Sequence, residues 1–230
     1  MVFFLRRRVL IGLVMIPFFC LGTAWGRLLA RKTAPIAIDP GHGGIDGGCQ
    51  DGRGNLEKDL NLALALLVAE NLRQKGYPVC LTREDDRDLG PTYRQDLLAR
   101  VEKARAAGAG LMVSLHANWS FDPAAEGALA LIPPGSPRSE LLARAILRRL
   151  REVCPVNPEP VVRGDHALLA NASCPITLVE VGFLSNPQEA ARLQEPSYRR
   201  AIARAVADGI EDYFRAKGKT PEWPRKGPGR

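Results

Sequence analysis

The chain has 230 residues, 46% of them hydrophobic and 25% charged, which is long enough for one sizeable folded core with short appendages. Its net charge of +7 comes from the ends: residues 1–32 carry six Lys or Arg and no acid, and residues 215–230 carry six and one acid. The ends thus contribute +11 and residues 33–214 carry −4, so nucleic acid is not an expected partner.

The first 32 residues have the pattern of an export segment. Three arginines, Arg6 to Arg8, precede an uncharged apolar run over residues 9–25. Two interpretations stay open for residues 1–32: a signal peptide cleaved near Ala24 and Gly26, or an uncleaved N-terminal membrane anchor. Both predict an exported, extracytoplasmic protein, and the second adds the membrane as a partner.

Strand and helix patterns alternate from residue 36 onward. IAID (36–39) is a short apolar strand, and a Gly-rich loop leads from it to Asn55, the expected N-cap of the first helix. That helix ends at Gly76, and its apolar positions recur at helical spacing: Leu60, Leu64, Leu67, Val68 and Leu72. The next strand is expected over residues 77–82.

The rest of the chain continues this alternation. Further helices are expected over about 91–107, 137–152 and 197–216, and further strands over 111–117, 128–132 and 176–183, with a weak strand at 167–170 after a Pro-rich loop. The pattern predicts one α/β domain over residues 33–216, with a mostly parallel or mixed central sheet and helices on both faces. Residues 217–230 form a basic, Pro/Gly-rich tail that is expected to be disordered.

Two of the three histidines lie where an open α/β sheet collects its ligands, beyond the carboxyl ends of strands. His42 follows the first strand within IAIDPGHGGIDGG, and His116 ends the strand at 111–117. Glu180 lies near the end of the last strand. A phosphate-binding glycine loop fails as an interpretation, because Asp46 stands where the third glycine belongs and no helix begins there.

Two neutral imidazoles and one carboxylate are a common ligand set for catalytic zinc, with a fourth position left for water. Glu57, at the start of the first helix, is the best candidate for the carboxylate. Four other acids near the loop are rivals: Asp39, Asp46, Asp51 and Asp59. Spacing alone carries this prediction weakly, because residues 42, 57 and 116 are far apart in the chain.

Five motifs, in order, closely resemble the zinc-dependent N-acetylmuramoyl-L-alanine amidase family of cell-wall hydrolases. They are DPGHGG (39–44), LEKD (56–59), TREDD (82–86), SLHAN (114–118) and VEVGFLSN (179–186), and the similarity spans about residues 35–214. The resemblance implies an α/β sandwich, one Zn²⁺ per chain held by His42, Glu57 and His116, and Glu180 as the catalytic acid/base. The implied substrate is peptidoglycan, a glycan strand with stem peptides.

Within the family, IDGG followed by LEKD looks most like the spore-cortex amidases, whose product allows a muramic lactam to form. This likeness implies a place between the forespore membranes; a general vegetative cell-wall amidase is the alternative. WSFDPAAE (119–126) is too short for the regulatory helix that some division amidases insert, which implies an open groove and an activator protein as a partner. Relatives often carry a basic residue where Ala170 and Asn171 stand here, and Arg163 is a substitute.

Asn118, Arg163 and His166 are the expected substrate-binding residues, and Asp39 is expected to fix the loop or to orient a metal ligand from behind. Glu189, Glu195 and Glu211 are expected to be solvent-facing helix charges. Two other functional classes compete with the zinc amidase. One is a cysteine peptidase using Cys174 or Cys49 with His166, although no nucleophile motif surrounds either cysteine. The other is a non-catalytic wall-binding module of the same fold.

Overall fold

The computed structural model describes residues 34–164 and 166–216. The predicted export segment (1–32) and the predicted basic tail (217–230) lie outside the described residues. None of the helices in the described part of the chain is both long enough and apolar enough to cross a membrane.

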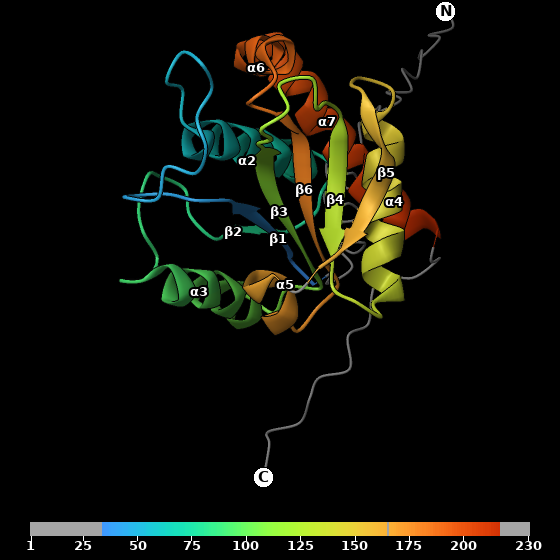
Figure 1. Cartoon of the computed structure of the whole chain (residues 1–230). Coiled ribbons are helices and arrows are strands. Elements are labelled where there is room, and N and C mark those ends of the chain that lie inside the picture. The colour runs from blue at the N-terminus through green and yellow to red at the C-terminus, as the bar shows by residue number, and fades with distance from the viewer. Residues whose placement is uncertain (1–33, 165, 217–230) are drawn as a thin grey trace, which may run out of the picture. The chain divides into compact units, whose positions relative to one another are not determined.

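A six-stranded sheet with the order β2-β1-β3-β6-β4-β5 forms the centre of the domain (Figure 1). Its strands are β1 (Ile36–Pro40), β2 (Val79–Leu81), β3 (Leu111–Asn118), β4 (Ala128–Ile132), β5 (Val156–Arg163) and β6 (Ile176–Phe183). β4 runs antiparallel to β6, and the other neighbouring pairs are parallel. The prediction of a mostly parallel, mixed sheet is confirmed, and the carboxyl ends of β1, β3 and β6 lie at the same edge.

Helices cover both faces of this sheet, as predicted. They are α2 (Glu57–Gln74), α3 (Tyr93–Ala106), α4 (Pro137–Leu150), α5 (Ala167–Asn171), α6 (Pro187–Gln194) and α7 (Pro196–Ala216). Buried side chains of α2, α4, α6 and α7 join the larger hydrophobic cluster, whereas those of α3 and α5 join a separate, smaller cluster. Figure 1 shows α3 and α5 together on one side of the sheet and α2 and α7 on the other.

The alternation of side chains along the strands decides which face carries the functional groups. In β3, Val113 and Leu115 face the larger cluster, and Met112 faces the smaller one under α3 and α5. By the same alternation, His116 of β3 and Glu180 of β6 lie on the face that α3 and α5 share. The site is therefore built at the carboxyl ends of β3 and β6, on the face of the sheet that α3 and α5 cover.

The predicted strand at residues 167–170 is wrong, because these residues form α5. Nδ1 of His166 accepts a hydrogen bond from Leu168 N at 3.4 Å and so caps this helix. The strand expected in this part of the chain is instead β5, which is formed by the segment that was predicted to be a Pro-rich loop. β5 lies at the edge of the sheet, and an edge strand tolerates prolines because fewer of its N–H groups are needed for pairing.

Two predictions about side chains are also wrong. Asn55 does not cap α2, because its side chain donates to Oδ2 of Asp51 at 2.7 Å and Leu56 occupies the cap position. Glu189 is not solvent-facing: it is 2% exposed and accepts hydrogen bonds from the backbone N–H groups of Phe183 and Gly127. Glu189 thereby fixes the turn that follows β6. It belongs to α6, a helix that the apolar spacing did not reveal.

Candidate active site

The glycine-rich loop after β1 presents His42 from a strained backbone position. His42 has a φ of +59°, in the left-handed region that side chains other than glycine rarely adopt. Gly43 and Asp46 exchange two backbone hydrogen bonds of 2.9 and 3.0 Å, which close a tight turn directly after the histidine. Nζ of Lys58, from α2, donates to the carbonyl of Gly44 at 2.7 Å and ties this turn to the helix. The turn after His42 is thus held both by its own backbone hydrogen bonds and by the helix.

Two glycines leave space for the neighbouring functional side chains. A Cβ on Gly41 would lie 2.2 Å from the ring of His116. A Cβ on Gly48, where φ is +67°, would lie 2.5 Å from Oε2 of Glu57. The glycine run is therefore explained by close approach of a histidine and a carboxylate to the backbone, as expected from its composition.

Two buried arginines hold the carbonyl groups of the same loop. Arg83, 2% exposed, donates to the carbonyl of Pro40 at 3.1 Å, and Arg100, also 2% exposed, donates to the carbonyl of His42 at 2.7 Å. Arg100 also pairs with Asp39 at 3.0 Å, which confirms that Asp39 fixes the loop. Neither arginine stood out in the sequence, and the position of Arg83 within the TREDD motif was the one available signal.

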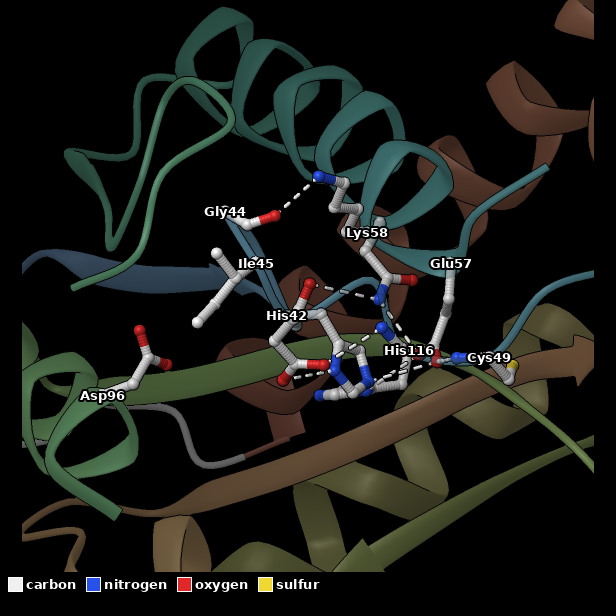
Figure 2. A network of polar contacts seen from close by, with 12 residues as sticks. His42, Gly44, Ile45, Cys49, Glu57, Lys58, Asp96 and His116 are labelled. Atoms are coloured by element: carbon white, nitrogen blue, oxygen red, sulfur yellow. Dashed lines mark hydrogen bonds and ion pairs between the residues drawn. The ribbon is translucent and has the colours of Figure 1, made fainter. Parts of the chain in front are cut away.

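Glu57, the first residue of α2, brings the two histidines together. Its Oε2 lies 3.1 Å from Nε2 of His42, and its Oε1 lies 3.0 Å from Nδ1 of His116 (Figure 2). One nitrogen or oxygen atom from each of these residues lies within 4.8 Å of the others, a spacing that a single metal ion can bridge. The structure thus brings together His42, His116 and Glu57, hereafter the trio. The rival acids Asp39, Asp51 and Asp59 are not part of it.

Glu57 is buried and held in the ionised state. It accepts hydrogen bonds from Cys49 N (3.0 Å), Ala117 N (3.1 Å) and the side-chain amide of Asn61 (3.0 Å). Burial alone would raise the pKa of Glu57, but the hydrogen bonds and charges of the two histidines outweigh it and hold this pKa well below its usual range. A carboxylate that stays negative is suited to holding a cation.

Asp46 orients His42 from the side opposite Glu57. Its Oδ2 lies 2.8 Å from Nδ1 of His42, so Nε2 is the nitrogen directed toward Glu57 and His116. Burial lowers the pKa of His42, but the hydrogen bonds and charges of Glu57 and Asp46 raise it to about 9. A carboxylate behind an imidazole is the usual way in which proteins orient a histidine ligand. Asp46, one of the rival ligands, therefore contacts the trio from outside.

Glu180 is placed beside the trio by strand pairing. Its Cα is the register partner of His116, and both side chains line the same cavity. Oε2 of Glu180 is buried and has no hydrogen-bond partner among the described residues. Burial raises the pKa of Glu180 to about 7, with a further contribution from the charge of Glu57, while the histidines act in the opposite direction. A carboxyl with a pKa near neutrality can both accept and donate a proton under physiological conditions.

The cavity around these groups has a volume of about 270 Å³. Six of the predicted site residues line it: His42, Glu57, His116, Asn118, His166 and Glu180. Oδ1 of Asn118 accepts from Trp119 N at 2.8 Å, and the pKa of half-buried His166 is lowered by burial and by the charges of the other two histidines. The backbone of Arg163 ends β5 opposite Ile132, and its side chain lies outside what the structure describes.

The cysteines lack the features of a catalytic nucleophile. Cys49, Cys80, Cys154 and Cys174 are free thiols in the described part of the chain. Burial raises the pKa of Cys174 to about 12, and burial followed by the charge of Glu57 raises that of Cys49. A reactive thiol needs the opposite shift, because the thiolate is the nucleophile. The cysteine peptidase interpretation is therefore disfavoured by the raised pKa values of these thiols as well as by sequence.

Comparisons with known proteins place this geometry in a family. A family model described as N-acetylmuramoyl-L-alanine amidase matches residues 36–212. The germination-specific N-acetylmuramoyl-L-alanine amidase of Bacillus subtilis is 36% identical over 208 residues, which cover 86% of each chain. The CwlD amidase of Clostridioides difficile, solved in complex with the GerS lipoprotein, is 33% identical, with a TM-score of 0.73 over 80% of this chain and 99% of that one. The catalytic domain of CwlV from Paenibacillus polymyxa is 32% identical, with a TM-score of 0.71 over 78% and 97%.

Proposed function

This chain belongs to the N-acetylmuramoyl-L-alanine amidase family, and we propose that it works with one Zn²⁺ bound by His42, Glu57 and His116. The family activity is hydrolysis of the amide bond between N-acetylmuramic acid and L-alanine, so its substrate is peptidoglycan, a glycan strand that carries stem peptides. The observation that carries the zinc proposal is the convergence of three ligand atoms within 4.8 Å.

The residues at this site fit zinc in particular. Two imidazole nitrogens and one carboxylate oxygen are a common protein ligand set for catalytic zinc. The buried backbone donors on Glu57 and the carboxylate behind His42 orient the ligands before an ion arrives. When bound, Zn²⁺ supplies an acidified water molecule and polarises the substrate carbonyl group.

Glu180 is the proposed acid/base. Its unpartnered Oε2 would take a proton from the attacking water as the water oxygen bonds to the amide carbon. As the C–N bond breaks, Glu180 would return that proton to the leaving amine of L-alanine. Proton transfer by a positioned side chain typically accelerates a reaction by about 10²–10⁴-fold.

Three further residues are proposed to contact the substrate. Asn118 and His166 line the cavity around the trio, from β3 and from the cap of α5 respectively. Arg163 ends the neighbouring edge strand β5 and would supply the positive charge that Ala170 and Asn171 do not offer.

The biological setting is proposed from the relatives. The germination-specific enzyme of Bacillus subtilis supports a role in spore cortex maturation, in which peptide removal allows muramic lactam to form. CwlD of Clostridioides difficile was solved with a lipoprotein, which supports an activator partner for this chain too. The proposed organisation is an export signal or anchor (1–32), an extracytoplasmic catalytic domain (33–216) and a basic tail (217–230).

Digestion of purified peptidoglycan tests the proposed function directly. Mass spectrometry of the products should show peptides that begin with L-alanine and glycan strands with free lactyl carboxyl groups. A chelator should abolish release and added zinc should restore it, while a thiol-blocking reagent should leave it intact. Chelator-resistant but thiol-sensitive release would point to a cysteine peptidase, and binding to the wall without release would point to a non-catalytic module.

A further inference from the structure

Two aromatic side chains stand exposed on the connection between β3 and β4. Trp119 is 45% exposed and Phe121 is 95% exposed. Their ring centroids are 4.8 Å apart and their planes are inclined at 80°, so the two rings form one edge-to-face pair. Exposed aromatic groups that gather in this way usually mark a binding surface.

The aromatic pair borders a groove of about 640 Å³, which is a typical size for a ligand site. The groove, hereafter the aromatic groove, lies between the β3–β4 connection, the loop before α2 and the helix α6; Figure 1 shows that connection beside α6. Trp119 lines both the aromatic groove and the cavity around His42, Glu57, His116 and Glu180, hereafter the catalytic cavity. A substrate that fills the catalytic cavity can therefore continue across Trp119 into this groove.

We propose that the aromatic groove binds the glycan strand of peptidoglycan, with Trp119 and Phe121 packing against the sugar rings next to the muramic acid whose amide is cleaved. The inference rests on the proposed function, because it assigns one part of the peptidoglycan substrate to one side of the same site. Trp119 and Phe121 would act as binding residues that select substrates with an extended glycan.

The charge of the groove favours the glycan over the stem peptide. Among the described residues that line it, only Asp51 and Arg53 are charged, and the carboxylate of Asp51 already accepts bonds from the backbone N–H groups of Arg53 and Asn55. The remaining lining combines the two aromatic rings and several aliphatic side chains with amide and hydroxyl groups, including Gln50 and Gln194. An uncharged N-acetyl sugar has an apolar ring face and a polar edge, and it matches this surface.

The opposite side of the catalytic cavity has a different character. A second adjoining cavity of about 260 Å³ shares Asp46, Tyr93 and Asp96 with the catalytic cavity and is also lined by Asp88. The three carboxylates there each contact a neighbouring group, Asp96 the Arg100 guanidinium, but their combined negative charge suits the amino group that a diamino acid places on a stem peptide better than it suits a neutral sugar. Because the cleaved amide joins glycan to peptide, the two parts must leave the site in different directions, and the aromatic groove is the side left for the glycan.

A binding experiment tests the groove without requiring turnover. Trp119 is the only tryptophan between Trp25 and Trp223, so the full chain with Trp25→Phe and Trp223→Phe reports on Trp119 alone. A peptide-free oligosaccharide of alternating N-acetylglucosamine and N-acetylmuramic acid should change its emission saturably, and a free stem peptide should not. Adding Phe121→Ala should weaken oligosaccharide binding roughly 3- to 10-fold. A response to the peptide alone, or no response to the oligosaccharide, would overturn the inference.

A kinetic experiment on zinc-loaded enzyme adds a second readout. Phe121→Ala, at a residue that lines the aromatic groove and not the catalytic cavity, should raise KM roughly 3- to 10-fold for a glycan oligomer that carries stem peptides, with kcat maintained. KM for a single N-acetylmuramyl peptide should stay at the wild-type value. Leu141→Ala removes another exposed apolar side chain, 52% exposed on α4, and is the matched control.

The two substrates separate failure of this inference from failure of the amidase proposal. Equal changes in KM for both substrates, or no change for either, would refute the glycan assignment while leaving the amidase activity established. A wild-type enzyme that released no peptide from either substrate would refute the amidase proposal, and the fluorescence titration would still decide what the groove binds.

Discussion

His116 and Glu180 are direct register partners on the parallel strands β3 and β6. The proposed metal ligand and the proposed acid/base are therefore held side by side by the backbone ladder rather than by a flexible loop. A shift of one residue in this register would turn one of the two side chains to the opposite face of the sheet. The buried apolar residues on both faces of these strands oppose such a shift, because they would exchange environments as well.

Replacing Glu180 with glutamine should separate metal binding from turnover. Glu180→Gln preserves the shape of the side chain and should retain zinc, because the three proposed ligands are untouched. Its kcat should fall by about 10²–10⁴-fold, since the amide cannot take a proton from water. Zinc content measured by mass spectrometry and peptide release from peptidoglycan check the two parts, with exposed Glu195→Gln as the control. Turnover at the wild-type rate in zinc-loaded Glu180→Gln would reject the assignment.

The same substitution should stabilise the metal-free protein at high pH. The pKa of Glu180 is raised by burial from 4.5 to about 7, so folding opposes its ionisation. Below about pH 4.5, Glu180 is protonated in both the folded and the unfolded state, so it does not change the free energy of unfolding. Between about pH 4.5 and 7 it ionises more readily in the unfolded state, so the folded state loses stability as pH rises. Above pH 7 this loss of stability is complete and stays constant. Glu180→Gln should therefore exceed the wild type by about 2–3 kcal/mol in unfolding free energy at pH 8 and match it near pH 4.5. Urea denaturation after metal removal measures this difference, and a gap independent of pH would contradict it.

The strong helices and strands could be predicted from the sequence because their signals are local. The apolar run of β3 and the helical spacing in α2 define their elements, and motif order identifies His42, Glu57 and His116. The placement of His42 and His116 at strand ends follows from the chain order of strands and helices alone. Convergence with Glu57 does not follow from spacing, and here the family resemblance was needed.

What could not be predicted depends on contacts between distant segments. Arg83 and Arg100 bind the carbonyls of a loop about 40 and 60 positions away, and an isolated arginine in a sequence has no pattern that shows this. Burial of Glu189 depends on backbone donors from two other segments. Over residues 156–171, the sequence predicted a Pro-rich loop followed by a strand, whereas the structure has the strand β5 followed by the helix α5. Prolines are compatible with an edge strand, but only the order of strands in the sheet shows that β5 lies at the edge.

Removing Asp46 should weaken zinc binding without removing a proposed ligand. Asp46→Ala deletes the carboxylate that lies 2.8 Å from Nδ1 of His42, so the imidazole loses its orientation. Zinc affinity should fall about 10- to 100-fold, as is typical for loss of a carboxylate behind a histidine ligand. Competition with a zinc-binding dye measures the affinity. Asp59→Ala, an exposed acid in the first turn of α2, is the control, and equal affinities for the two variants would exclude this role of Asp46.

Replacement by alanine should impair the site at one glycine of this loop and be harmless at another. Gly41→Ala places a Cβ 2.2 Å from the ring of His116 and must displace it, so zinc affinity and activity should fall at least about 10-fold. Gly52→Ala meets nothing within 4 Å and should leave both unchanged. Circular dichroism should show the same helix content for both variants, and zinc titration should distinguish them. A Gly41→Ala enzyme with wild-type affinity would mean that the ring and loop can move apart without consequence.

The buried pair of Asp39 and Arg100 should dominate the stability of the loop. Their side chains are 1% and 2% exposed and 3.0 Å apart, and Oδ2 of Asp39 also accepts from Ser114 at 2.6 Å. Asp39→Asn removes one of the two carboxylates that pair with the buried Arg100 guanidinium and leaves Asp96, 2.6 Å from its Nε, as the other, so the unfolding free energy at pH 7 should fall by about 1–3 kcal/mol.

The loss of stability caused by Asp39→Asn should depend on pH. Burial acts to raise the pKa of Asp39, but the charge of Arg100 and the hydrogen bonds from Ser114 and Thr82 prevail and place it below 3.8. The stabilisation is therefore fully present above about pH 4 and is lost as pH falls through the folded-state value. Urea denaturation should show the gap between wild type and Asp39→Asn closing in acid. Glu102→Gln, which breaks a pair between exposed side chains with Arg105, should produce no comparable gap at any pH, because water screens that pair.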